Sequence, residues 1–319
     1  MNDNDPGIER CGACANTSSS LMKCSGCRLV RYCGKVCQAN DWSQHKQLCK
    51  EKKKADREVM LFQNQEGTHL GECPICLLPL PFDADRIMDA EDEECYHFMG
   101  EMTHSPCCWT VVCTKCFDAH IITACKEQKK PTCPFCRCKT PEDSDKNTDE
   151  LLELSIDHEN NPTLLMKVGA LQCRKGNNGA AFTSYKKAAK LGDAQGMYFV
   201  STMLHLGIGV TMNHGKAAAY VKKAAAGGHP IARYEAGMDE LCRGNTIRAV
   251  KHFCIAASQG VTKSLEKLKN GYRSGYVTKS EYEQALRSNQ KAKEAMKDNE
   301  ETRQQMLADS KRNVTFHYK

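Results

Sequence analysis

The sequence predicts two small cysteine-rich modules followed by an all-α array of helical repeats and a C-terminal helix. Three observations predict this fold class. The chain of 319 residues has 21 cysteines, of which seven lie between Cys11 and Cys49, eleven between Cys73 and Cys138, and only three after that. Alanine pairs followed by a glycine recur in the second half. A polar, acidic stretch separates the two halves, so two or three compact units are expected.

The clustered thiols favour metal sites over disulfides. The N-terminus MNDNDPGIER has no apolar segment of the secretory type, and no stretch approaches the roughly 18 apolar residues of a membrane span. We therefore expect a cytoplasmic or nuclear protein with reduced thiols, and paired reduced thiols favour zinc. The net charge of +6 is modest, and the basic run Lys52 to Lys54 has no interleaved aromatics. It favours a solvated linker over a nucleic-acid surface, and no membrane partner is expected.

The first module offers four pairs of potential ligands. They are Cys11/Cys14, Cys24/Cys27, Cys33/Cys37 and His45/Cys49. A C-x-x-C pair can aim both sulfurs at one ion, and a gap of three residues places two ligands one turn apart on a helix. Eight ligands make two closed four-coordinate sites, the pattern of structural zinc. About forty residues bury little apolar core, so zinc binding, on the order of 10 kcal/mol per site, would supply the folding free energy.

The run YCGKVCQANDWSQHKQLC, from Tyr32 to Cys49, resembles the C-terminal half of the MYND zinc finger. The resemblance implies interleaved sites and the binding of short proline-containing peptides of partner proteins. Gln38 and Trp42 match the family's groove positions, and packing of Trp42 on the zinc core is an equal alternative. The implied ligand sets are Cys11, Cys14, Cys33 and Cys37 for one zinc, and Cys24, Cys27, His45 and Cys49 for the other.

The second module contains three cysteine motifs, ECPICLLPL from Glu72, PCCWTVVCTKC from Pro106 and CPFCR from Cys133. These motifs resemble those of a RING finger. The implied sites are Cys73, Cys76, Cys113 and Cys116, then Cys107, Cys108, Cys133 and Cys136, which gives about four zinc ions per chain. The usual histidine of the third pair is missing between Trp109 and Val112. Because adjacent cysteines chelate awkwardly, His104, Cys95 or His97 are alternatives to Cys107.

The resemblance also implies a function for this module. RING fingers that act as ubiquitin ligases do no covalent chemistry but hold a ubiquitin-conjugating enzyme in a reactive arrangement. Ile75 and Pro134 match the family's apolar shelf, and Arg137 matches the donor that bridges the enzyme and ubiquitin, a role that suits a planar guanidinium. The same residues occur in RING fingers that only form a scaffold.

The second half shows internal repeats. The string A-A-x-x-G ends at Gly192, Gly228 and Gly260, at spacings of 36 and 32 residues. The paired alanines let two helices approach closely, and each glycine is expected to end its helix in a left-handed cap. Residues 161–277 resemble the Sel-one-like repeats, relatives of the tetratricopeptide repeat. The resemblance implies an α-solenoid with a concave protein-binding face, and an alanine-rich helical bundle is the alternative.

A polar helix is expected after the repeats. Thr278 is a candidate N-cap for a helix from about Lys279 to Ser310, supported by pairs such as Glu283/Arg287. Its sparse apolar residues predict a solvated capping helix rather than a coiled coil.

The expected organisation combines these parts. The predicted boundaries are a tail at 1–8, the MYND finger at 9–52, a basic linker at 53–70, the RING-like finger at 71–140, an acidic linker at 141–160, repeats at 161–277, and a helix and tail at 278–319. We expect a RING-type ubiquitin ligase whose repeats and MYND finger select substrate proteins. The alternative is a non-catalytic, zinc-dependent adaptor, such as a scaffold or a transcriptional or chaperone cofactor.

Two other enzyme classes are disfavoured. A MYND finger also occurs in SET-type lysine methyltransferases, but the sequence has no convincing cofactor motif of that fold. Cys173, Cys242 and Cys254 lack a neighbouring motif that would activate a nucleophile, and lone cysteines in helices are usually buried packing residues.

Overall fold

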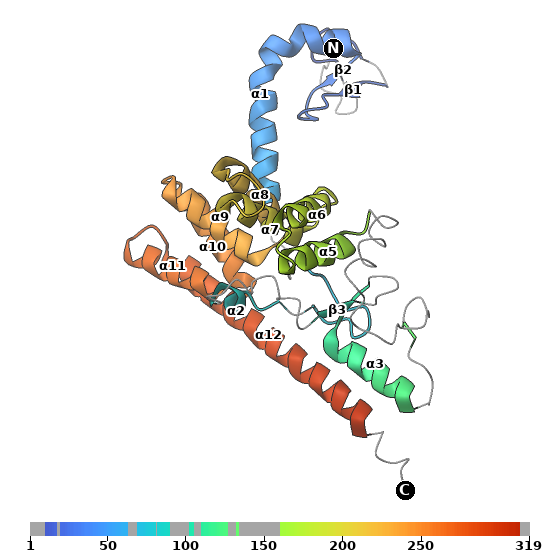
Figure 1. Cartoon of the computed structure of the whole chain (residues 1–319). Helices are drawn as coiled ribbons and strands as arrows, with labels where there is room; N and C mark the ends of the chain where they lie inside the picture. Colours follow the sequence, from blue (N-terminus) through green and yellow to red (C-terminus); the bar gives the residue numbers. More distant parts are fainter. Residues whose placement is uncertain are drawn as a thin grey trace. The chain divides into compact units, whose positions relative to one another are not determined.

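The computed structural model describes residues 10–17, 20–62, 69–80, 82–89, 102–104, 110–126, 132–133 and 160–312. The chain divides into two compact units, Met1–Gln63 and Asn64–Lys319 (Figure 1). The predicted fold class, cysteine-rich modules able to bind zinc followed by an array of helical hairpins, is confirmed.

The first unit contains a two-stranded ribbon and one long helix. Strands β1 (Met22–Lys23) and β2 (Arg31–Tyr32) are antiparallel, and α1 spans Lys35–Phe62. The helix runs ten residues beyond the expected end of the finger at residue 52, so the first part of the expected linker is helical. The reason is local: Lys35–Phe62 has no glycine or proline and many straight-chain residues, which favour helix. An ion pair of 2.7 Å between Lys52 and Asp56 adds support one turn apart.

The second unit begins with the segment that was predicted to be a RING-like finger, called the RING-like segment after that prediction. It contains α2 (Ala84–Asp89), the antiparallel strands β3 (Met102–His104) and β4 (Val111–Cys113), and α3 (Thr114–Lys126). Strand β4 leads directly into α3, which places the cysteine at the end of the strand next to the first turn of the helix.

Helical hairpins form most of the second unit. The helices are α5 (Pro162–Arg174), α6 (Asn178–Lys190), α7 (Ala194–Leu206), α8 (His214–Ala226), α9 (Pro230–Cys242), α10 (Thr246–Ser258), α11 (Thr262–Arg273) and α12 (Lys279–Arg312). Helices α5 and α6, α7 and α8, and α9 and α10 pack as hairpins, and each hairpin packs on the next. This is the stacked arrangement of a solenoid, in which neighbours bury a core that one repeat could not bury alone.

The repeated alanines and glycines have the predicted roles. Ala188, Ala224 and Ala256 are fully buried at the helix contacts. Gly192 and Gly260 end their helices with φ of 96° and 94°, in the left-handed region that favours glycine. The repeated alanine–glycine string therefore reflects two structural requirements: close packing of neighbouring helices and a sharp turn where the helix ends.

The C-terminal helix α12 differs from the prediction of a solvated helix. Its N-terminus is capped as expected: the Thr278 hydroxyl accepts from the Glu281 N–H, and the Glu281 carboxylate accepts from the Thr278 N–H at 2.8 Å, a capping box. The helix packs against α3, α10 and α11, however. The Arg303 side chain is buried and donates to the Pro79 carbonyl. Composition could not reveal this packing, because α12 buries polar side chains, Asn289 and Arg303, as well as the small Ala285.

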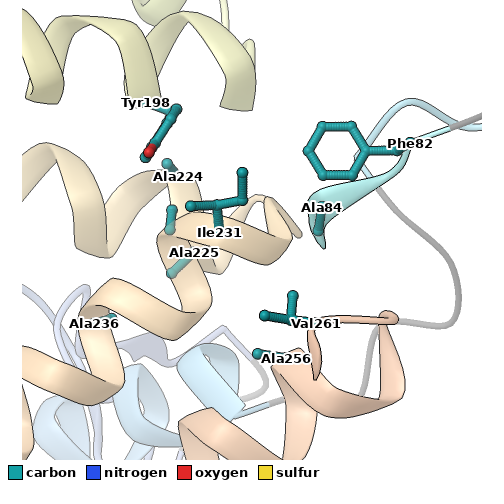
Figure 2. Packing of buried hydrophobic residues seen from close by; sticks show 10 residues of the cluster. Phe82, Ala84, Tyr198, Ala224, Ala225, Ile231, Ala236, Ala256 and Val261 are labelled. Atoms are coloured by element: carbon teal, nitrogen blue, oxygen red, sulfur yellow. The ribbon is translucent and has the colours of Figure 1, made fainter. Parts of the chain in front are cut away.

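The RING-like segment and the repeats share one core. Phe82 and Ala84 pack with Tyr198 of α7, Ile231 of α9 and Val261 at the N-cap of α11 (Figure 2). A separate module on a linker was expected at 71–140. The physical reason for the difference is that this segment brings its own apolar side chains to the inter-hairpin surface.

Polar contacts of His69 and Asp85 also join this part of the chain to the repeats. The rings of His69 and His229 stack at 4.6 Å, and the Gln195 side-chain oxygen accepts from Nε2 of both, at 3.0 and 3.1 Å. Asp85 accepts from the Thr262 N–H and hydroxyl at 2.8 and 2.6 Å. These bonds cap α11, whose own N-cap residue makes no side-chain cap bond.

Candidate zinc centres and peptide site

In the described part of the chain, three groups of cysteine and histidine side chains converge. The first zinc site is Cys11, Cys14, Cys33 and Cys37; the second is Cys24, Cys27, His45 and Cys49; the third is Cys73, Cys76, Cys113 and Cys116. Within each group the four ligand atoms lie within 4.8 Å of one another. Each group offers four donors, the number that closed structural zinc sites use.

The first and second sites interleave along the chain, as the resemblance implied. Helix α1 serves both sites: Cys37 in its first turn belongs to the first, whereas His45 and Cys49, four residues apart on one face, belong to the second. The buried Tyr32 donates to Asp41 on the same helix at 2.6 Å. A single rigid helix therefore fixes the geometry of both sites.

The distances between ligand atoms fit zinc. Tetrahedral Zn–S bonds of about 2.3 Å require sulfur atoms roughly 3.8 Å apart, and a mixed sulfur–nitrogen edge is about 3.6 Å. Cys14 and Cys33 are separated by 3.5 Å and Cys24 and Cys49 by 3.9 Å, sulfur to sulfur. His45 Nε2 lies 3.4 Å from the Cys24 sulfur. The residues present therefore fit the metal, and every ligand of the second site is buried.

Backbone N–H groups favour a thiolate in each of the first two sites. The N–H of Cys14, with those of Ala13 and Cys33, lowers the pKa of Cys11 to about 6. Burial opposes ionisation of Cys24, but the N–H groups of Cys27 and Gly26 outweigh it and lower its pKa to about 6. Such preformed thiolates are the form that binds metal.

Neighbouring thiols in the same two sites have raised pKa values. Hydrogen bonds with Cys14 and Cys11 raise the pKa of Cys33 to about 12, and burial beside the Cys24 thiolate raises the pKa of Cys49. Like charges in one cluster therefore resist joint ionisation unless a cation joins them.

The third site combines a tight turn that carries a C-x-x-C pair, here called a knuckle, with the junction between β4 and α3. Cys73 and Cys76 come from the knuckle, whereas Cys113 ends β4 and Cys116 lies in the first turn of α3. Burial opposes ionisation of Cys73, but the N–H groups of Cys113, Cys76 and Ile75 lower its pKa to about 7. Burial raises the pKa of Cys116. The charge pattern matches that of the first two sites.

Three knuckles share one backbone conformation, which sequence reasoning missed. Ala15, Arg28 and Leu77 each follow the second cysteine of a C-x-x-C pair, and their φ values are 57°, 58° and 58°. Each N–H donates to the carbonyl of the first cysteine of its pair, at 2.8 to 2.9 Å. Left-handed φ is uncommon outside glycine. Its recurrence indicates that the third site is built like the first two.

The predicted fourth site lies almost wholly outside the described residues. Cys107, Cys108 and Cys136 fall there, as do the alternatives Cys95 and His97. Cys133 is described and buried. His104 is described only as a backbone position of β3. The choice among these ligands stays a prediction.

Gln38 and Trp42 lie one turn apart on α1. The Gln38 amide donates to the Cys24 sulfur at 3.5 Å, and the Trp42 and His45 rings are 6.1 Å apart. Trp42 is nevertheless 41% exposed. Its ring thus borders a zinc ligand and still presents apolar surface to solvent, so neither interpretation of Trp42 excludes the other.

The residues expected to contact a conjugating enzyme are only partly described. Ile75 is 37% exposed on the Cys73–Cys76 knuckle, and the neighbouring Leu77 is 69% exposed. Pro134 and Arg137 lie outside the described residues.

Cys173 and Cys254 of the repeats have raised pKa values. Burial raises the pKa of Cys254 to about 11 and also raises that of Cys173. Both are only partly buried and Cys242 is exposed, contrary to the expectation that these residues are buried. A thiol whose pKa is raised is a poor nucleophile at neutral pH.

Comparison with known proteins identifies the first unit. Residues 11–49 match the MYND finger family. The chain is 41% identical over 49 residues to Protein CBFA2T2 of Mus musculus and 37% identical over 60 residues to Histone-lysine N-methyltransferase ASHR1 of Arabidopsis thaliana. These matches cover 15% and 19% of this chain and only 8% and 12% of the relatives. The likeness is therefore one of the MYND finger, not of whole proteins.

Two solved structures resemble part of the chain. A Sel1 repeat protein from Oxalobacter formigenes has a TM-score of 0.40 at 26% identity and covers 48% of this chain and 47% of its own. The protective antigen c5321 from uropathogenic Escherichia coli, which displays an SLR fold, has a TM-score of 0.39 at 25% identity and covers 47% of this chain and 33% of its own. Among the described residues, no helix has both the length and the apolar character needed to cross a membrane.

Proposed function

We propose that this chain is a zinc-dependent protein–protein interaction protein whose MYND finger binds a short proline-containing segment of a partner across Gln38 and Trp42. The observation that carries the proposal is the exposure of Trp42 beside a zinc ligand. An indole ring held on a rigid helix offers a flat apolar face, and aromatic faces are what extended proline-rich segments dock against.

Zinc dependence follows from the position of this surface. The helix turn that bears Gln38 and Trp42 lies between Cys37 and His45, ligands of different sites. A finger of this size has little core besides its ligands, so loss of zinc unfolds the surface. Peptide binding and zinc content are therefore expected to fall together.

The test uses the full zinc-loaded chain and an array of proline-containing peptides. Trp42→Ala is expected to abolish binding of every captured peptide, whereas Val36→Ala leaves it intact. Val36 is the matched control because it is an exposed apolar residue of the same helix, 73% accessible, and it is not in the proposed contact. Equal loss in both variants, or unchanged binding after Trp42→Ala with zinc content intact, would refute this use of the finger.

A second candidate function is ubiquitin transfer through the RING-like segment. The exposed Ile75 on the knuckle of the third zinc site supports it, since a conjugating enzyme needs an apolar shelf there. Pro134 and Arg137 would complete the contact by their resemblance to RING residues, and the repeats and MYND finger would select the substrate. Catalysis would come from positioning the enzyme–ubiquitin thioester.

The discriminating assay is autoubiquitination across a panel of conjugating enzymes. Ile75→Ala and Arg137→Ala should each abolish chain formation if the module is a ligase. Ile247→Ala is the matched control, because Ile247 is an isoleucine of α10 that is 75% exposed and remote in sequence from the knuckle. If no conjugating enzyme supports ubiquitin transfer while the zinc content is full, the ligase function is refuted and only the adaptor function remains.

A further inference from the structure

A groove lies between α7, α8 and α9 of the repeats. Its volume is about 490 Å³. The side chains of Ala217, Ala218 and Ala236 line it, and small side chains at these positions leave room between the helices. Val221 and Met238 add apolar surface. The groove can therefore accept the apolar stem of a long side chain.

Glu235 is a carboxylate of this groove, and among the described residues its hydrogen-bond partner is a neutral side chain. The Tyr198 hydroxyl donates to it at 3.0 Å. Burial raises the pKa of Glu235, and the bond from Tyr198 only partly offsets that effect. In the part of the chain that the structure describes, Glu235 makes no ion pair within 4.0 Å. A desolvated carboxylate in this state gains from a cation placed against its free lone pairs.

Glu240, on the same helix α9, shows the contrast. It lies 3.3 Å from Lys222 Nζ and 3.4 Å from Arg248 Nε, and Asn245 donates to it at 2.9 Å. Burial opposes its ionisation, but these partners lower its pKa overall. Lys222 also pairs with Asp239 at 3.4 Å. Lys222, which lines the groove, is thus held by two other carboxylates, and within the described ranges no cation pairs with Glu235.

The mouth of the groove offers polar groups as well. Nδ1 of His205 and Nδ1 of His214 lie 3.2 Å apart at the facing ends of α7 and α8. Thr202 also lines the groove. Imidazole and hydroxyl groups both donate and accept hydrogen bonds, as the backbone of an extended peptide requires.

We propose that this groove binds an extended segment of a partner protein that inserts an arginine side chain against Glu235, with its alkyl stem over the alanine floor. Arginine fits better than lysine because its guanidinium is more weakly hydrated and forms paired hydrogen bonds with a carboxylate. This site is distinct from the one proposed at Gln38 and Trp42, since the two belong to different compact units.

The test is a methyl NMR titration of the full zinc-loaded chain, labelled at methionine Cε and alanine Cβ. The probe is a capped hexapeptide pool with arginine fixed at the third position and Ala, Leu, Ser and Gly randomised elsewhere. A second pool carries citrulline, which has the same shape without the charge, in place of arginine. The arginine pool is expected to shift the Met238 and Ala218 signals in a saturable manner, and the citrulline pool to bind at least about tenfold more weakly.

Variants locate the interaction. Glu235→Gln keeps an acceptor for Tyr198 and removes the charge, so the arginine pool should bind at least about tenfold more weakly. Ala218→Leu fills the groove without altering charge and should abolish the shifts. Glu266→Gln, a change at an exposed carboxylate of α11, should leave binding unchanged.

Two further outcomes separate the proposals. Trp42→Ala should leave the arginine-dependent shifts intact, so failure at the MYND finger and failure at the groove are distinguishable. Equal binding of the arginine and citrulline pools, unchanged binding after Glu235→Gln, or absence of shifts at Met238 and Ala218 would each overturn the groove proposal. Signals outside the groove report folding of every variant.

Discussion

Replacing Asp85 tests whether the RING-like segment holds the end of the repeat array. Its carboxylate caps α11 through both the N–H and the hydroxyl of Thr262, and it lies 2.8 Å from Lys293 Nζ on α12. Loss of an N-cap costs about 1–2 kcal/mol. The partly exposed ion pair adds about 0–1 kcal/mol. Asp85→Ala should therefore destabilise α11 by about 1–3 kcal/mol.

Hydrogen exchange measured by mass spectrometry gives the direct readout. Protection in the first turn of α11 is expected to fall about 5- to 150-fold in Asp85→Ala, since 1.4 kcal/mol corresponds to a factor of ten. Asp118→Ala is the control, because Asp118 is an exposed aspartate of α3 with no part in the cap. A double-mutant cycle with Thr262→Ala should give a coupling energy of about 1 kcal/mol or more.

The pH dependence of this effect has a fixed sign. Burial opposes ionisation of Asp85, but Lys293 and Thr262 together lower its pKa below the usual 3.8. A carboxyl whose folded-state pKa is lowered stabilises the fold above its unfolded pKa, and this contribution disappears as the pH falls through the folded value. Unchanged α11 protection in Asp85→Ala at neutral pH, or an equal loss in Asp118→Ala, would refute the cap between segments.

Three other predictions concern the zinc sites and the shared core. In Gly26→Ala the new methyl group would lie 2.6 Å from the Cys49 sulfur, so zinc measured by mass spectrometry should fall by one ion per chain; a full complement would contradict this packing. Phe82→Ala should lower the free energy of urea unfolding of the second unit by about 3 kcal/mol, because a buried ring leaves a cavity; a loss below 1 kcal/mol would mean that the ring is not part of the core. Burial lowers the pKa of His69 from 6.5 to about 4. Between pH 6.5 and 4 the free energy of unfolding of the wild type should therefore fall by about 3 kcal/mol more than that of His69→Gln. Parallel pH profiles of the two proteins would contradict this prediction.

The parts of the structure that repeat or chelate could be predicted from the sequence. Spacings of two or three residues predicted the pairs of metal ligands, and the alanine–glycine strings predicted close helix contacts and left-handed ends. Each of these features carries its signal within a few residues. The assignment of the pairs to the two interleaved sites of the MYND finger did not follow from spacing and came from the resemblance to that family.

The contacts between distant segments could not be predicted in this way. The partners of Phe82, Asp85 and Arg303 are single residues up to 224 positions away, with no periodicity that would reveal them. The groove also escaped prediction, because Glu235 becomes distinctive only when its neighbours in space are known. Polar residues of α12 were assigned to solvent for the same reason.

The segment of residues 69–89 has a mechanical consequence for the repeat array. In an ordinary solenoid each repeat contacts only its neighbours, so the array can bend elastically and its terminal repeats can unfold one at a time. Here one segment contacts α7 through Gln195, α9 through Ile231, and α11 through Thr262. A change in the angle between these helices must therefore break the contacts with the segment at the same time. The array should consequently be stiff from α7 to α11, and under tension this part should rupture in one event instead of a series of steps.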